Sequence, residues 1–177
     1  MSTIRPPAVA GLFYPADPAQ LHSDIEAMLS TAAQTEPESA PKALIVPHAG
    51  YIYSGPVAAS AFAQLKNIRH SVKRVILLGP CHRVPLRGLA TSTADYFATP
   101  LGSIKIDHEA IAQIAALPQV REFDLTHQQE HSLEVQLPFL QEVLDDFTLV
   151  PLVVGDASAE EVGAVLEILW GGDETLI

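Results

Sequence analysis

Two histidines stand directly after short apolar runs, where their imidazole nitrogens could bind a metal ion. His48 lies in the segment PHAGY (47–51) and His82 lies in the segment GPCHR (79–83). Imidazole suits iron, zinc and copper. Two interpretations are open at this point: a joint metal site, or two histidines that each only hydrogen-bond a tight loop. Tyr51 and Tyr53, close to His48, either line the same pocket or simply pack.

The elements around these histidines predict that they lie close together. Residues 43–46 and 74–78 are short apolar runs typical of buried strands, and the alanine-rich stretch 56–66, which opens with Pro56, predicts a helix between them. A strand, helix and strand in this order form a βαβ unit with parallel strands. Neighbouring parallel strands are about 4.8 Å apart, and their carboxyl ends form the sheet edge at which ligands gather.

The rest of the chain predicts a mixed α/β fold. Asp17 and Pro18 form a helix-start signal, and Leu21 and Ile25 follow at helical spacing. Further strands are expected at 86–92, 95–98 and 148–154, and further helices at 108–117 and 158–170. Strands alternate with helices around an extended middle section. This order predicts a mixed, partly parallel sheet with helices on both faces.

A second histidine cluster, HQQEH at 127–131, matches the His-x-x-Glu-His pattern of one class of zinc peptidases. That mechanism needs His127 and His131 on one unbroken helix, whereas Pro138 removes a backbone donor and clashes with the preceding turn. Leucines at 133, 137, 140 and 144 keep helical spacing, which predicts a helix with a late or distorted start. In the plainer interpretation the leucines pack in the core, while Glu130 and His131 form hydrogen bonds at the first helical turn.

Other residues that could do chemistry are assigned structural roles. His22, His70 and His108 stand among polar neighbours and are expected on the surface. Cys81 could act as a metal ligand or a redox thiol, but small cysteines commonly pack without reacting, and we favour that role. Asp156 follows the apolar run at 148–154 and is expected to cap the helix after it rather than bind a cation.

Composition excludes several partners and locations. The formal net charge is −11, so a nucleic-acid backbone would be repelled. No apolar run approaches the roughly 18 residues that cross a membrane. The chain does not open with the basic and apolar segments of a secretory signal, and its one cysteine, Cys81, allows no internal disulfide. We therefore expect a cytoplasmic protein whose partner is a small molecule or a peptide.

Four ordered motifs give the chain a resemblance to the MEMO family, whose bacterial and archaeal members are often called AmmeMemoRadiSam system protein B. They are RPPAVAGLFYP (5–15), PHAGY followed by YSG (47–55), GPCH (79–82), and EHSLE followed by LP (130–138). The resemblance implies a fold similar to that of the class III extradiol dioxygenases, which bind Fe(II) with two histidines and a carboxylate. His48 and His82 match the two histidine positions. The resemblance also favours a place in or around the same pocket for Glu130 and His131.

The resemblance further implies that metal binding by this chain is incomplete. Family members usually continue for roughly another hundred residues, still within one ordinary domain. The continuation normally provides a cysteine as third metal ligand, and an Asp and a His suited to proton transfer. Residues 1–177 are therefore expected to be the N-terminal part, about two-thirds, of one MEMO-like domain. We expect weak binding of iron, or else of copper or zinc, because the third ligand lies beyond Ile177.

These observations favour a metal-dependent redox protein related to the extradiol dioxygenases. Three alternatives stay open. The chain could be a non-catalytic module that binds a peptide or protein in the same pocket. It could be a zinc peptidase that uses His127, Glu130 and His131. It could also be an inactive fragment, whose incomplete sheet would leave an unpaired edge.

Overall fold

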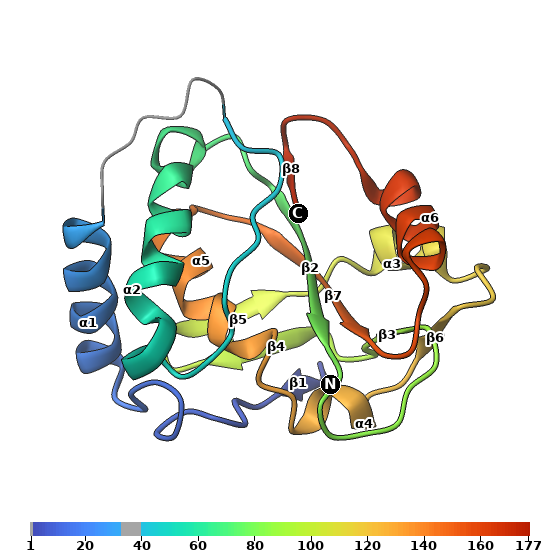
Figure 1. Ribbon diagram of the computed structural model, residues 1–177, viewed down its shortest axis with the longest axis horizontal. Coiled ribbons are helices and arrows are strands. Elements are labelled where there is room, and N and C mark those ends of the chain that lie inside the picture. Colours follow the sequence, from blue (N-terminus) through green and yellow to red (C-terminus); the bar gives the residue numbers. More distant parts are fainter. Residues whose placement is uncertain (1, 33–39) are drawn as a thin grey trace.

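The computed structural model describes residues 2–32 and 40–177, and its centre is a five-stranded sheet (Figure 1). The strand order is β6-β3-β7-β2-β8. The bounds are Arg74–Pro80 for β2, Leu89–Thr91 for β3, Val120–Glu122 for β6, Thr148–Val154 for β7 and Thr175–Leu176 for β8. β2 and β7 pair in parallel along their whole length, β8 is parallel to β2, and β3 runs antiparallel to β7. The sheet is therefore mixed and partly parallel, as predicted.

A second, three-stranded sheet has the order β1-β4-β5. Its strands are Ile4–Arg5 for β1, Tyr96–Thr99 for β4 and Gly102–Lys105 for β5. β1 is parallel to β4, with Arg5 paired to Phe97, and β4 is antiparallel to β5. This sheet fixes the N-terminal segment against the middle of the chain.

Helices cover both faces of the five-stranded sheet, with α1, α2 and α5 on one side and α3 and α6 on the other (Figure 1). This arrangement confirms the predicted α/β class. No helix in the described ranges has the length and apolar character needed to span a membrane. The helices are α1 (Pro18–Thr31), α2 (Tyr51–Phe62), α3 (His108–Ile114), α4 (Leu125–Gln128), α5 (Leu137–Val143) and α6 (Ala159–Leu169), with 3-10 segments η1 (Ala63–Ile68) and η2 (Glu134–Gln136).

Local signals account for the starts of the longer helices. At α1 the side chain of Asp17 accepts a backbone hydrogen bond from the first turn, and Pro18 is the first helical residue, as predicted. At α6 the side chains of Ser158 and Glu161 form a capping box. The expectation that Asp156 caps this helix is therefore wrong, because the hydroxyl of Ser158 takes that place.

The predicted strand at 43–46 does not form a ladder, although the segment lies extended beside β8. Leu44 N donates to Ile177 O at 2.8 Å and Ile177 N donates to Lys42 O at 3.1 Å, which is the pattern of a parallel pair. β8 therefore lies between this segment and β2. The two expected strands of the βαβ unit, at 43–46 and 74–78, are therefore not adjacent.

α2 begins at Tyr51, five residues before the predicted start at Pro56. Gly50 caps the helix with extended backbone, and Pro56 lies inside it. Tyr51 is buried, and its hydroxyl donates to Val135 O at 2.8 Å. The helix thus starts at a residue that is fixed by a tertiary contact, although Pro56 cannot donate a backbone hydrogen bond within it.

Candidate metal site

Three histidine rings meet beyond the carboxyl end of β2. One nitrogen from each of His48, His82 and His131 lies within 4.8 Å of the other two. The ring centroids are 5.3 Å apart for His48 and His82, and 4.5 Å apart for His82 and His131. Each side chain comes from a separate part of the chain. The tertiary fold, and no local motif, therefore creates the cluster.

β2 carries His82 into this cluster. The strand ends at Pro80, two residues before His82. Gly79 lets the strand pass close to a neighbouring loop, since a Cβ at this position would lie 2.6 Å from Ser132 Oγ and 2.7 Å from Leu133 Cδ1. Ser132 Oγ donates to Pro80 O at 3.0 Å. The end of β2 and the loop that carries His131 are thus held side by side.

A buried carboxylate, Glu130, fixes the orientation of His82. Glu130 Oε2 accepts a hydrogen bond from His82 N at 2.7 Å, and Oε1 lies 2.8 Å from His82 Nδ1. Oε1 also accepts bonds from the backbone N of His131 and of Ser132, each at 2.9 Å. Burial alone would raise the pKa of Glu130, but these hydrogen bonds outweigh it and hold the pKa at about 2. An ionised Glu130 favours a proton on His82 Nδ1, which leaves Nε2 free to bind a metal ion.

His131 offers a nitrogen that lies 3.4 Å from Glu130 Oε1. Its Nδ1 is buried and has no hydrogen-bond partner in the part of the chain that the structure describes. Burial lowers the pKa of His131, against the opposing effect of the Glu130 charge. The ring of Phe13 packs on it, with centroids 4.7 Å apart. A neutral imidazole is suited to metal binding.

His48 reaches the cluster from the extended segment beside β8. Gln136 Nε2 donates to Pro47 O at 3.1 Å, and Tyr51 N donates to Phe13 O at 2.8 Å. These bonds anchor the chain on both sides of His48. Burial lowers the pKa of His48, and the neighbouring His82 lowers it further, so that the neutral ring is favoured.

The structure brings His48 and His82 together, as predicted, although β8 lies between the segments that carry them, and adds His131 to them. The sequence placed His131 either in the surroundings of the pocket or in a zinc-peptidase motif with His127, and expected a third ligand beyond Ile177. The chain itself presents a third imidazole nitrogen, and the expected ligand beyond Ile177 stays a prediction. No sequence pattern marks His131 in this role, because its place depends on how its loop packs against β2. The assignment of these histidines as ligands stays a prediction.

Tyr51 and Tyr53, which the sequence suggested as possible lining residues of the pocket, lie elsewhere. Tyr51 packs in the core, where its ring contacts Tyr14 and Phe139. Tyr53 is 83% exposed on the outer face of α2. Phe13, which sequence reasoning missed, contacts the cluster instead. Its one signal is its position in the N-terminal motif at 5–15.

The zinc-peptidase arrangement is not formed. His127 lies in α4, whereas Glu130 and His131 follow that helix and precede η2, so no single helix carries both histidines. His127 is buried with Nε2 3.1 Å from Ala90 O, and burial lowers its pKa to about 4. η2 leads into α5 with Pro138 in the first turn, which confirms the predicted late helix start.

The other candidate side chains keep the structural roles predicted for them. His22, His70 and His108 have side chains that are 50%, 81% and 45% exposed. Cys81 Sγ donates to Val84 O at 3.0 Å and is not one of the three clustered groups.

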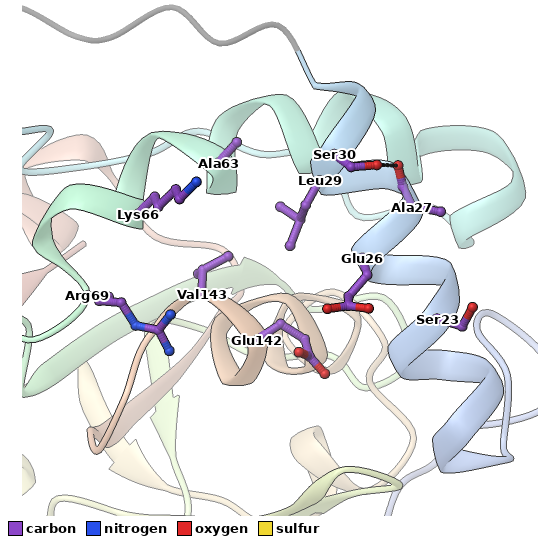
Figure 2. Close-up of a pocket in the computed structure, with 10 residues that line it drawn as sticks. All are labelled: Ser23, Glu26, Ala27, Leu29, Ser30, Ala63, Lys66, Arg69, Glu142 and Val143. Carbon is purple, nitrogen blue, oxygen red and sulfur yellow. Dashed lines mark hydrogen bonds between the residues drawn. The ribbon is translucent and has the colours of Figure 1, made fainter.

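A separate cleft of about 690 Å³ lies between α1, η1 and α5 (Figure 2). Figure 2 shows Lys66 and Arg69 at one end of it and Glu26 and Glu142 at the other. Arg69 Nη2 pairs with Asp145 at 2.9 Å, so part of this charge is neutralised within the protein. The lining residues come from these helical segments and not from the segments that carry the three histidines.

The mixed sheet, the helices on both of its faces and the histidine cluster at its edge define an α/β protein with a candidate metal centre. The chain belongs to the Memo-like family, because the family model described as Memo-like protein matches residues 5–171. The resemblance predicted from the four motifs is therefore confirmed.

Relatives of the chain carry the same family name. It is 43% identical over 161 residues to a MEMO1 family protein of Ignicoccus hospitalis. It is 38% identical to MEMO1 family proteins of Sulfolobus acidocaldarius, over 167 residues, and Aquifex aeolicus, over 152 residues. Each match covers 85% of this chain and 55% to 57% of the relative. The chain therefore spans somewhat more than half the length of these relatives.

Proposed function

We propose that His48, His82 and His131 bind one transition-metal ion, with Fe(II) as the first choice and copper or zinc next. The observation that carries this proposal is that one nitrogen of each ring lies within 4.8 Å of the other two. Metal–nitrogen bonds to histidine are about 2.0–2.1 Å long, so small side-chain movements suffice to place three nitrogens around one ion.

The chemistry of the donors supports the proposal. A metal ligand must be unprotonated, and the lowered pKa values of His48 and His131 favour neutral rings. A carboxylate that holds the second ring nitrogen is the usual partner of a metal-binding histidine, and Glu130 fills that place at His82. Three imidazoles suit iron, copper and zinc better than magnesium or calcium.

We infer a metal-dependent redox function from the site and the family. Bound iron would supply the redox chemistry that the likeness to extradiol dioxygenases implies. The chain itself would hold the three rings in place and fix one tautomer of His82 through Glu130. The His82 side chain is 37% exposed, which leaves one side of the cluster open to a small molecule. A reducing cytoplasm is the proposed location, since it keeps iron as Fe(II) and Cys81 as a thiol.

Metal titration of the purified chain tests the proposal. Fe(II) is added without oxygen, and Co(II) serves as a probe with visible absorption. We expect a single bound ion in the wild type. His48→Ala, His82→Ala and His131→Ala should each weaken binding by more than the roughly 10- to 100-fold that follows loss of a ligand's hydrogen-bond partner. His70→Ala is the matched control, because the His70 ring is 81% exposed outside the cluster.

The outcomes separate the hypotheses. Equal metal binding in the wild type and all three alanine variants would contradict the proposal. If His131→Ala alone keeps wild-type affinity, His131 is not a ligand and a third ligand from elsewhere is favoured. A wild-type chain that binds no metal favours the alternative of a non-catalytic module that binds a peptide or protein in the same pocket.

A further inference from the structure

A buried ion pair connects the N-terminal motif to η2, which directly follows the loop that carries Glu130 and His131. Arg5 Nη1 lies 2.5 Å from Glu134 Oε2, and the two side chains are 6% and 0% exposed. The proposed function leaves this pair unused. Such pairs are weak evidence for stability, because the cost of desolvating two charges offsets their attraction. The role of the pair is therefore inferred from the hydrogen bonds that Arg5 and Glu134 make to their neighbours.

Arg5 clamps the turn that precedes His131. Its Nε donates to His127 O and its Nη2 donates to Glu130 O, both at 2.9 Å. The guanidinium lies over the ring of Phe97, 5.2 Å from its centroid. The planar fork of arginine can hold several acceptors at fixed positions, which lysine cannot do. One side chain thus fixes the carbonyl groups at both ends of residues 127–130.

Glu134 ties the same clamp to the N-terminal segment. Besides Arg5, its carboxylate accepts hydrogen bonds from Ala8 N at 2.8 Å, Val9 N at 2.9 Å and the hydroxyl of Tyr14 at 2.6 Å. Burial raises the pKa of Tyr14, and the charge of Glu134 raises it further, so that the hydroxyl remains a donor. Residues 5–14 are thereby wrapped around one buried carboxylate.

Glu130 is consequently held from two sides. Arg5 binds its backbone carbonyl, while its own carboxylate binds the ring and the backbone of His82. His131 is the next residue in the chain. A displacement of the Glu130 peptide would therefore move His131 and turn the ring of His82 at the same time.

We propose that Arg5 and Glu134 are positioning residues for the candidate metal site, which they serve by fixing the Glu130 peptide and hence the placement of His131 relative to His82. The metal readout of this inference rests on the proposed function. The placement of the His82 and His131 rings can be followed by NMR without metal.

Two variants and one control test the inference. Glu134→Gln keeps the volume of the side chain and removes its charge. Tyr14→Phe removes a single donor to Glu134, and serves if the first variant does not fold. Asp107→Asn is the matched control: it also changes a carboxylate to an amide beside an arginine, Arg74, at 2.7 Å. That pair lies at the start of β2, whereas His82 follows the other end of the strand.

Two measurements are made on each folded variant, at a temperature where circular dichroism shows the native state. The first is the affinity for Co(II), and the second is the NMR signals of the histidine rings without metal. We expect Glu134→Gln to weaken Co(II) binding by about 10-fold and Tyr14→Phe to weaken it by a smaller factor. Both variants should move the ring signals of His82 and His131, and Asp107→Asn should change neither readout.

Two results would overturn the inference. One is a folded Glu134→Gln protein, or in its absence a folded Tyr14→Phe protein, with wild-type affinity and unmoved ring signals. The other is an equal loss of affinity in Asp107→Asn, which would make the effect one of general stability. If the wild type binds no Co(II), the proposed function fails, and the ring signals decide alone: moved signals support the positioning role and unmoved signals refute it.

Discussion

Replacement of Glu130 by glutamine is the change that most directly tests how the site is held. Glu130→Gln keeps the shape of the side chain but leaves one acceptor oxygen instead of two. The carboxylate accepts a bond from His82 N at Oε2, and bonds from the His82 ring, His131 N and Ser132 N at Oε1. Both oxygens of the carboxylate are acceptors, so the NH₂ group of the glutamine in Glu130→Gln would face at least one of these donors in either orientation of the side-chain amide. The variant must therefore leave a buried donor unpaired.

The pKa of Glu130 gives the size of the expected change in the free energy of unfolding. The hydrogen bonds lower the pKa from 4.5 to about 2, and the side chain is 1% exposed, so solvent screens them little. A difference of this size corresponds to about 3 kcal/mol of stability at neutral pH. Because the folded-state pKa is the lower one, this stabilisation is present above pH 4.5 and is lost as the pH falls toward 2. Glu130→Gln should thus lower the free energy of unfolding by about 3 kcal/mol at pH 7, and by much less at pH 2.5.

Urea unfolding followed by circular dichroism, repeated from pH 7 to pH 2.5, measures this difference. Glu167→Gln serves as the control, since Glu167 is exposed on α6. We expect the control to follow the wild type at every pH. The reasoning is refuted if Glu130→Gln is as stable as the wild type at pH 7, or if the gap between them is the same at pH 2.5.

Three further predictions concern other parts of the fold. Gly79→Ala should lower the free energy of unfolding by about 1–3 kcal/mol, because its Cβ would clash with Ser132 and Leu133; an unchanged melting temperature would contradict the close approach. Burial lowers the pKa of His127 from 6.5 to about 4, so the unfolded chain takes up this proton first and about 3 kcal/mol of stability is lost as the pH falls from 6.5 to 4; the urea series should show a smaller loss over this range in His127→Gln. Ser158→Ala removes the capping box of α6 and should cost about 0.5–2 kcal/mol in thermal unfolding, with Co(II) affinity unchanged.

The fold was predictable where a segment's own residues decide its structure. The run at 74–78 and the run at 148–154 become β2 and β7, which pair along their whole length in the centre of the sheet. The run at 43–46 has the same apolar character, but its backbone bond to the sheet edge is the one from Leu44 N to Ile177 O. Apolar periodicity identifies an extended segment, whereas its partner strand is set by the rest of the fold. The start of α2 was wrong for a similar reason, since burial of Tyr51 outweighs the signal of Pro56.

The candidate site was predictable only where a segment's own residues indicate its place in the fold. Topology alone placed His48 and His82 at one edge of the sheet, because both follow extended apolar runs. His131 follows no such run. Its place depends on bonds from Glu130 to His82 and from Arg5 to the Glu130 carbonyl, which join residues far apart in the sequence. Spacing within the segment 127–131 contains no trace of those partners and suggested a peptidase motif instead.

The three clustered rings also make the site a reporter of folding. His48, His82 and His131 lie dozens of residues apart in the sequence, so an unfolded chain does not hold them together. An ion that needs all three would bind only the native state, and would raise the unfolding temperature with its concentration by mass action. Long loops must close before the rings meet, and long-range contacts of this kind form slowly. We therefore expect the visible absorption of Co(II), added to a refolding chain, to appear with the last steps of assembly.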